Sequence, residues 1–193
     1  MKIYDISQEL FSCVVFPGDP APVRQTLSSM EEGALYNLTA LSLCAHNGTH
    51  IDAPYHFIKG GKTVDEVPVS KTVGWAYVAQ EEGMLSAKDA HRILADAKKA
   101  HPEAAKRILV GGKVIVTEEA AHVFAEANID LLGNESQTIG PEDAPMQVHL
   151  ILLSREVVLL EGIRLDGVPT GAYLPQPPPS LWQVVTAPPA AQF

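Results

Sequence analysis

The sequence has few of the features by which disulfide-rich, membrane and secreted proteins are recognised. It holds only two cysteines, Cys13 and Cys44, too few for a disulfide framework or a cysteine-type zinc site. No run of about 18 apolar residues is present, so we expect no membrane span, and the first residues lack the apolar stretch of a secretory signal. We therefore expect a cytoplasmic protein in which both cysteines are small buried residues. The alternative for Cys44 is that its thiol lines the functional site.

Positive charge is also scarce. The chain has 14 Lys and Arg against 23 Asp and Glu, which gives a formal net charge of −9. A nucleic-acid partner requires a basic face that neutralises phosphates, so this class of partner is not expected. A small-molecule substrate remains compatible, because local fields matter more than total charge for a small ligand.

The length of 193 residues suits one domain over residues 1–193, since a single core can grow to roughly 250 residues. Neither an internal repeat nor a low-complexity linker divides the chain. Residues 175–193 differ in composition, with prolines at positions 177–179 and 188–189. Proline cannot donate to a strand ladder, so we expect this segment to be an extended tail.

Hydrophobic periodicity predicts strands mixed with helices, an α/β composition. Ser86 can cap a helix that runs to residue 100, and Thr117 with two glutamates after it can begin a helix that ends near residue 128. The expected strands are residues 2–7, 23–28, 36–44, 73–80, 107–110, 129–132 and 156–162. The end of a helix is expected at residues 148–153. Turns are expected at residues 16–20 and 59–62, and an irregular strand or turn at residues 165–173.

The chemistry is concentrated in residues 46–56, which read HNGTHIDAPYH. His46, His50, Asp52 and His56 all fall on even positions. Successive side chains of an extended chain alternate sides, so these four can share one face while the odd positions from 51 to 57 face the core. Gly48 and Pro54 argue against one helix through the segment.

Clustered ionisable groups are costly to bury unless something satisfies them, and a divalent cation does so directly. Imidazole and carboxylate are the usual ligands of zinc and also suit iron or manganese. His46, His50 and Asp52 make three ligands, and the run holds neither thiolates nor another strong ligand that a closed structural site would use. The run therefore favours a catalytic metal with an open position for water.

The run resembles the pattern H-x-G-T-H-x-D-x-P-x-H of the cyclase family, metal-dependent amidohydrolases that include bacterial kynurenine formamidase and isatin hydrolase. Similarity extends over residues 16–19 (FPGD), 133–141 (GNESQTIGP), 165–168 (LDGV) and 171–173 (GAY), and over the spacing of His149 and Glu161. The resemblance implies a swivelling β/β/α fold, a single domain with a mostly β core and flanking helices. It also implies a homodimer or higher homo-oligomer.

The resemblance further implies a role for each site residue. His46, His50 and Asp52 would bind one divalent metal, and Asp52 would bridge to a second that is also held by His149 and Glu161. The metals would be zinc, with manganese as the alternative. His56 would be the catalytic acid/base, and a metal-activated water would cleave the C–N bond of a small amide, formamide or lactam.

Several positions depart from the family pattern near the expected substrate pocket. Phe16 stands where formamidases usually have a tryptophan, and it cannot donate a hydrogen bond to a substrate oxygen. Glu135, Thr138 and Gly140 replace Asp, Ser and Asp. Because of these departures, a non-catalytic metal-binding protein stays an alternative. Two others are a lactone hydrolase on the same site and a mononuclear Fe(II) oxygenase that uses His46, His50 and either Asp52 or Glu161.

Overall fold

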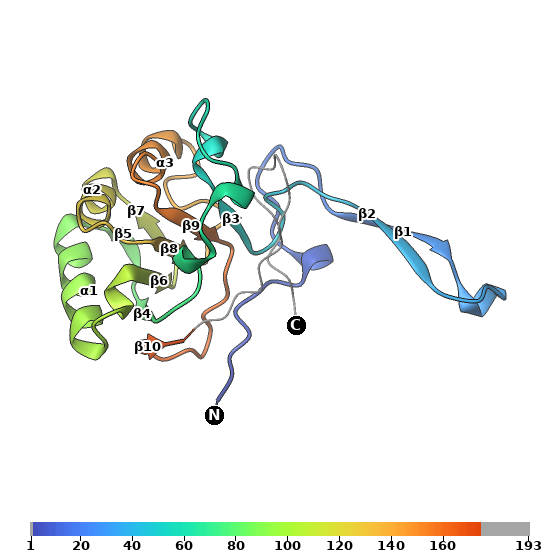
Figure 1. Cartoon of the computed structure of the whole chain (residues 1–193), viewed down its shortest axis with the longest axis horizontal. Coiled ribbons are helices and arrows are strands. Elements are labelled where there is room, and N and C mark those ends of the chain that lie inside the picture. Colours follow the sequence, from blue (N-terminus) through green and yellow to red (C-terminus); the bar gives the residue numbers. More distant parts are fainter. Residues whose placement is uncertain (1, 175–193) are drawn as a thin grey trace.

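A six-stranded mixed sheet organises the protein in a computed structural model that describes residues 2–174 (Figure 1). The strand order is β10-β4-β6-β8-β9-β3. The four inner strands run parallel, whereas the two outer strands pair antiparallel with their neighbours. The bounds are β3 His50–Asp52, β4 Ala76–Gln80, β6 Arg107–Gly111, β8 Leu131–Asn134, β9 Val158–Glu161 and β10 Gly171–Tyr173.

Three α-helices of the described chain lie beside this sheet: α1 Ala87–Ala100, α2 Glu118–Glu126 and α3 Met146–Leu153 (Figure 1). The two predicted caps are confirmed. The Ser86 hydroxyl accepts the Asp89 N–H, and the Thr117 hydroxyl accepts the Ala120 N–H. Each cap satisfies one backbone donor that has no partner inside its helix.

Apolar side chains of the sheet alternate between two cores. Along β4, Tyr77 and Ala79 face a core shared with the helices, while Ala76 and Val78 face a second core on the opposite side. Residues 163–168 and the N-terminal segment with Tyr4 and Ile6 cover that second side. The mixed α/β class expected from the sequence is confirmed.

A hairpin projects from this body. Strands β1 (Val23–Ser28) and β2 (Leu38–Ser42) pair antiparallel with each other and form a separate two-stranded sheet (Figure 1). A second small sheet, which the sequence did not predict, joins β5 (Gly83–Leu85) to β7 (Val114–Val116). Short 3-10 helices lie at Leu10–Ser12, Met30–Glu32, Pro54–His56, Val64–Glu66, Val69–Lys71 and Ala104–Lys106.

The strand predicted over residues 2–7 is wrong. The backbone there bonds to side chains and a loop instead of a ladder: Ser7 N–H donates to Asp5 Oδ1 at 2.9 Å, and Arg164 N–H donates to the carbonyl of Ile6 at 2.8 Å. The expected tail over residues 175–193 lies outside the described residues. Among residues 2–174, no helix is long and apolar enough to cross a membrane.

Candidate metal centre

Strand β3 carries two of the candidate ligands at the edge of the sheet. His50 lies directly opposite Glu161 of β9 in the antiparallel register, and Asp52 lies opposite Leu159. Because directly opposed residues of an antiparallel pair point to the same side, this register brings His50 and Glu161 together. His50, Asp52 and Glu161 are buried.

The prediction that residues 46–56 form one extended run is wrong outside β3. His46 lies in a turn in which the Asn47 side chain accepts the Cys44 N–H at 2.9 Å. His56 ends the 3-10 helix Pro54–His56, whose first residue has the fixed φ that suits a helix start. Tyr55, expected to face the core, is 42% exposed. The even-numbered side chains still converge, but through a turn, a short strand and a helical turn.

Asp52 lies at the centre of the cluster. Its Oδ1 atom is 3.1 Å from His46 Nδ1 and 3.7 Å from His50 Nε2, and its Oδ2 atom is 3.7 Å from His56 Nε2 and 3.6 Å from His149 Nε2. Four imidazoles therefore surround one buried carboxylate. Its two oxygens face different pairs of histidines, as a carboxylate shared by two cations would require.

Glu161 supplies the second carboxylate. Its Oε2 atom is 3.4 Å from His50 Nε2, and its Oε1 atom is 3.2 Å from His149 Nε2. Two triads have donor atoms that all lie within 4.8 Å of one another: His46, Asp52 and His56, and His50, Asp52 and Glu161. The structure thus brings together all six residues that the sequence assigned to the metals and the acid/base, although Glu161 is nearly as close to His50 as to its expected partner His149.

The pKa values of the cluster reflect two opposing effects, burial and the charges of neighbouring side chains. Burial opposes ionisation of Asp52, but contacts with His149 and His46 outweigh burial and lower the pKa of its carboxyl. Burial also disfavours the charged form of His149, yet the Asp52 and Glu161 carboxylates raise the pKa of His149 to about 10. At His50, burial is likewise outweighed by the Glu161 and Asp52 carboxylates, which raise its pKa. At His56, burial dominates and lowers the pKa. A cation bound here would displace the proton of His149.

The donor set fits a divalent metal. Within residues 2–174, both carboxylate oxygens of Asp52 and the Nε2 atom of His50 are buried without a hydrogen-bond partner. Such groups are costly unless a partner satisfies them, and imidazole nitrogen with carboxylate oxygen is a zinc-type ligand set. His50 Nε2 lies 3.7 Å from Asp52 Oδ1, near enough for one bound cation to satisfy both atoms.

Backbone carbonyls orient the two buried imidazoles. His50 Nδ1 lies 3.0 Å from the carbonyl of Gly48, and His149 Nδ1 lies 2.8 Å from the carbonyl of Pro145. When Nδ1 carries the proton and donates to the carbonyl, Nε2 presents its lone pair to the cluster. The Ile139 N–H donates to Glu161 Oε1 at 2.8 Å and holds that carboxylate in place.

Two residues beside the cluster were missed by sequence reasoning. The Phe57 ring packs 4.4 Å from the His56 ring and 4.6 Å from the His149 ring, between centroids, and so contacts both the candidate acid/base and a candidate ligand. Gly162 follows Glu161, and its carbonyl accepts the Thr49 hydroxyl at 2.7 Å. Their adjacency to His56 and Glu161 was the only signal in the sequence.

The turn with Phe16 is fastened to the ligand segment. Asn47 Nδ2 donates to the carbonyl of Pro20 at 3.2 Å, and Cys44 Sγ donates to Asp19 Oδ2 at 3.6 Å. Cys13 and Cys44 are free and half-buried rather than fully buried, and burial raises the pKa of both thiols. Cys44 therefore connects the Phe16 turn to the segment that carries His46.

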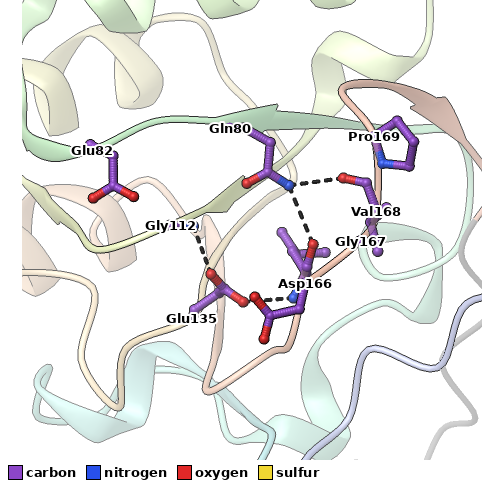
Figure 2. A pocket seen from close by; sticks show the side chains of 9 residues that line it. Gln80, Glu82, Gly112, Glu135, Asp166, Gly167, Val168 and Pro169 are labelled. Carbon is purple, nitrogen blue, oxygen red and sulfur yellow. Dashed lines mark hydrogen bonds between the residues drawn. The ribbon is translucent and has the colours of Figure 1, made fainter.

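The departures at positions 135 and 140 have structural explanations. Glu135 accepts the Gly112 N–H at 2.6 Å and the Leu165 N–H at 2.7 Å, and so joins two loops (Figure 2). It lines a surface hollow of about 410 Å³ that none of the six candidate site residues lines. A Cβ at Gly140 would lie 3.1 Å from Val148 Cβ, so glycine lets this segment pack closely against α3.

Replacing Gly162 with alanine should destabilise the protein by about 2–4 kcal/mol, because strained backbone and overpacking add. Its φ is +68°, and a Cβ there would lie 2.4 Å from the amide nitrogens of Gln8 and Gln137 and 2.5 Å from the Gly48 carbonyl. That carbonyl orients His50. Thermal unfolding should show Tm lower by roughly 5–15 °C.

Gly167 provides the matched control. Its φ is +71°, but a Cβ there would meet nothing within 4 Å. Gly167→Ala therefore isolates the backbone cost, about 1 kcal/mol. If the two variants unfolded at the same temperature, the close packing around Gly162 would have no energetic weight.

Comparison with known proteins places the chain in a family. A family model described as "Putative cyclase" matches residues 4–141. The kynurenine formamidase of Salinibacter ruber (strain DSM 13855 / M31) is 30% identical over 188 residues, covering 90% of this chain and 87% of the relative. The kynurenine formamidase of Bacillus anthracis is 29% identical over 186 residues, covering 89% and 87%.

Solved structures agree in fold. One described as a potential metal-dependent hydrolase with cyclase activity superposes with a TM-score of 0.81 at 25% identity, covering 98% of this chain and 94% of the other. Isatin hydrolase A from Labrenzia aggregata has a TM-score of 0.75 at 20% identity, covering 97% and 91%. Fold and donor set define a metal-dependent hydrolase class, and the chain belongs to the cyclase family. It is an enzyme of that family.

Proposed function

We propose that the protein is a binuclear metal-dependent amidohydrolase that cleaves the C–N bond of a small amide, formamide or lactam. The observation that carries the proposal is the Asp52 carboxylate, buried without a hydrogen-bond partner in the described chain and surrounded by four imidazoles. The kynurenine formamidases at about 30% identity support the choice of a C–N bond over a lactone.

In this proposal His46, His50 and Asp52 hold one divalent ion, and Asp52, His149 and Glu161 hold the second. Glu161 Oε1 lies 3.2 Å from His149 Nε2, which supports its assignment to the second ion, and its Oε2 atom lies 3.4 Å from His50 Nε2 of the first. Zinc is the proposed metal and manganese the alternative, because imidazole and carboxylate suit both. When bound, the metals would supply a water whose pKa is near 7.

His56 is the proposed proton carrier. Its side chain is 25% exposed, more than that of His50 or His149, so it can reach a substrate while its Nε2 atom stays 3.7 Å from Asp52. Burial lowers its pKa, which keeps the imidazole neutral near pH 7 and able to take a proton. His56 would then return that proton to the leaving nitrogen.

The substrate is proposed only by class. Phe16, on the turn fastened to the ligand segment, would contact the substrate through its ring, since a phenyl ring has no donor for a carbonyl oxygen. The small-molecule partner, the homodimer and the cytoplasmic location expected from the sequence stay predictions.

The test joins a metal count to an activity screen. The purified protein, dialysed and then loaded with zinc or manganese, should retain close to two ions per chain by elemental analysis. It should hydrolyse at least one member of a panel that contains N-formylkynurenine, isatin, simple anilides and lactones, with kcat in the ordinary range of about 1–1,000 per second.

Each rival predicts a different result. Two ions without turnover across the panel would support a non-catalytic metal-binding protein, and turnover of lactones alone would support the lactone hydrolase. One ion with oxygen consumption would support a mononuclear oxygenase. That last rival gives no role to His149, whose Nε2 atom lies 3.2 Å from Glu161 and 3.6 Å from Asp52.

A further inference from the structure

Gln8 is a buried polar side chain that has no part in the proposed reaction. Only 6% of it is exposed, and it lies in an N-terminal segment, residues 2–9, that forms neither helix nor strand. A buried primary amide is costly unless its donors and its acceptor are hydrogen-bonded. The partners of Gln8 therefore indicate what this side chain holds in place.

The amide of Gln8 binds backbone at both of its ends. Nε2 donates to the carbonyl of Gly162 at 2.7 Å, and Oε1 accepts the Val14 N–H at 3.1 Å. The backbone N–H of Gln8 donates to the Thr49 hydroxyl at 2.8 Å, and that hydroxyl donates to the same Gly162 carbonyl at 2.7 Å. Gln8, Thr49 and Gly162 thus form a closed set of three hydrogen bonds, here named the Gln8 triangle.

The Gln8 triangle lies at the end of the ladder that carries two candidate ligands. His50 and Glu161 are directly opposite in the β3–β9 pair, and both strands end there. Thr49 and Gly162 are the next residues outward, and Gly162 has a φ of +68°, which is incompatible with an extended strand. The triangle therefore joins the two chains at the point where the ladder stops.

This junction controls how His50 and Glu161 lie relative to each other. His50 Nε2 is 3.4 Å from Glu161 Oε2, and each residue is covalently bonded to a member of the triangle, Thr49 or Gly162. Metal-binding side chains must be held within roughly 0.5 Å of the productive geometry. A shift of Gly162 away from Thr49 would move the Glu161 backbone directly and exceed that tolerance easily.

Other contacts hold the Glu161 segment from a different side. The Gly162 N–H donates to the carbonyl of Ser136 at 2.7 Å, and the Ile139 N–H donates to Glu161 Oε1 at 2.8 Å. Both of these donor–acceptor pairs involve the loop that follows β8. Loss of Gln8 would leave them intact, so we expect the fold to persist while the position of Glu161 becomes less well defined.

We propose that Gln8 is a positioning residue for the metal centre, which holds Glu161 beside His50 through the Gly162 carbonyl and the Thr49 hydroxyl. The inference rests on the proposed function, since it concerns the residues that would bind the metals. Partners that orient metal ligands typically contribute about 10–100-fold to metal affinity. Gln8 acts through its neighbours and needs no contact with substrate or metal.

Zinc affinity, measured by competition with a chromogenic chelator, tests the inference. Gln8→Met keeps the length of the side chain and removes its donor, so the dissociation constant of the ion held by Glu161 should rise about 10–100-fold. Glu161→Gln alters the ligand itself and so identifies which of the two dissociation steps belongs to that ion. An unchanged dissociation constant for this ion in Gln8→Met would overturn the inference.

Gln80→Met is the matched control. The Gln80 amide also donates to a backbone carbonyl, that of Val168 at 2.9 Å, but Gln80 lines the surface hollow rather than the metal cluster. Both variants lose a hydrogen bond of the same kind, so both should lower the Tm of the metal-free protein. Only Gln8→Met should weaken zinc binding. A similar loss of zinc affinity in both variants would attribute the effect to general destabilisation and contradict a positioning role.

Thr49 gives a second pair of variants that does not alter Gln8. Thr49→Val keeps the shape of the side chain but removes the hydroxyl that links Gln8 to Gly162, so it should weaken the same ion at least tenfold. Thr49→Ser keeps the hydroxyl and should stay within about threefold of the wild type. Equal zinc affinity in the valine and serine variants would show that the triangle does not position the ligands.

The zinc content of the wild type separates this inference from the proposed function. If the wild type held one ion instead of two, the binuclear function would fail, whereas the role of Gln8 would still be decided by whether Gln8→Met weakens that ion. A wild-type protein that bound no zinc would overturn both. Two ions with unchanged affinity in Gln8→Met would leave the proposed function standing and remove only the role of Gln8.

Discussion

Asp52→Asn should leave a folded protein with less than about 0.2 metal ions per chain and at least a 10⁴-fold loss of hydrolysis. The substitution keeps the side-chain size and removes the charge at the centre of the cluster. Both oxygens of Asp52 face histidine nitrogens at 3.1–3.7 Å, so one change takes a ligand from each proposed site. Elemental analysis of zinc-loaded, dialysed protein measures the occupancy.

The control for this variant is Asp166→Asn, which removes the same charge from an exposed carboxylate in the surface hollow. It should keep two ions and wild-type turnover. Far-UV circular dichroism of Asp52→Asn checks that the sheet and helices persist. If that variant still bound two ions, Asp52 would not be a ligand that both sites require.

The period of two in residues 46–56 predicted part of the arrangement of the site residues. A period of two placed His50 and Asp52 on one face of a strand, and β3 has that geometry. It misplaced His46 and His56, because Asn47 closes a turn and Pro54 begins a 3-10 helix. The residues still converge, since their positions depend on the turns as much as on the strand.

Periodicity alone could not predict which residues lie opposite one another across the sheet. Nothing in the spacing of His149 and Glu161 fixes the register that sets Glu161 opposite His50. The assignment of His149 and Glu161 as metal ligands followed from resemblance to the family. The contacts of Phe57 and Gly162 were equally hidden, since packing against a ring and a φ of +68° arise only in the folded chain.

In the fold, too, elements with a local signal were predicted and elements that depend on distant contacts were not. Ser86 and Thr117 predicted their helices because capping is local chemistry. The N-terminal strand failed because Asp5 offers its carboxylate to the Ser7 N–H, a local bond that competes with a ladder. The three-residue strands β5 and β7 are too short to show a period, and their parallel pairing depends on a long connection that contains both α1 and β6.

His56→Ala should separate proton transfer from metal binding. The variant should keep close to two ions per chain while kcat falls by about 10²–10⁴-fold, the usual contribution of a general acid/base. KM should change less than about threefold, because the lost group acts on a proton rather than on substrate affinity. His122→Ala is the control, since His122 is exposed on α2 and should leave both quantities unchanged.

The pH profile adds a readout that simple misfolding would not produce. Burial lowers the pKa of His56, so the acid limb of kcat that reports this imidazole should lie below pH 6.5 in the wild type, apart from the limb of a metal-bound water with a pKa near 7. That limb should disappear in His56→Ala. Because His56 also lies in a close triad with His46 and Asp52, loss of one ion in the variant would instead make it a metal ligand. Metal content and the acid limb together therefore decide whether this imidazole carries a proton or holds a cation.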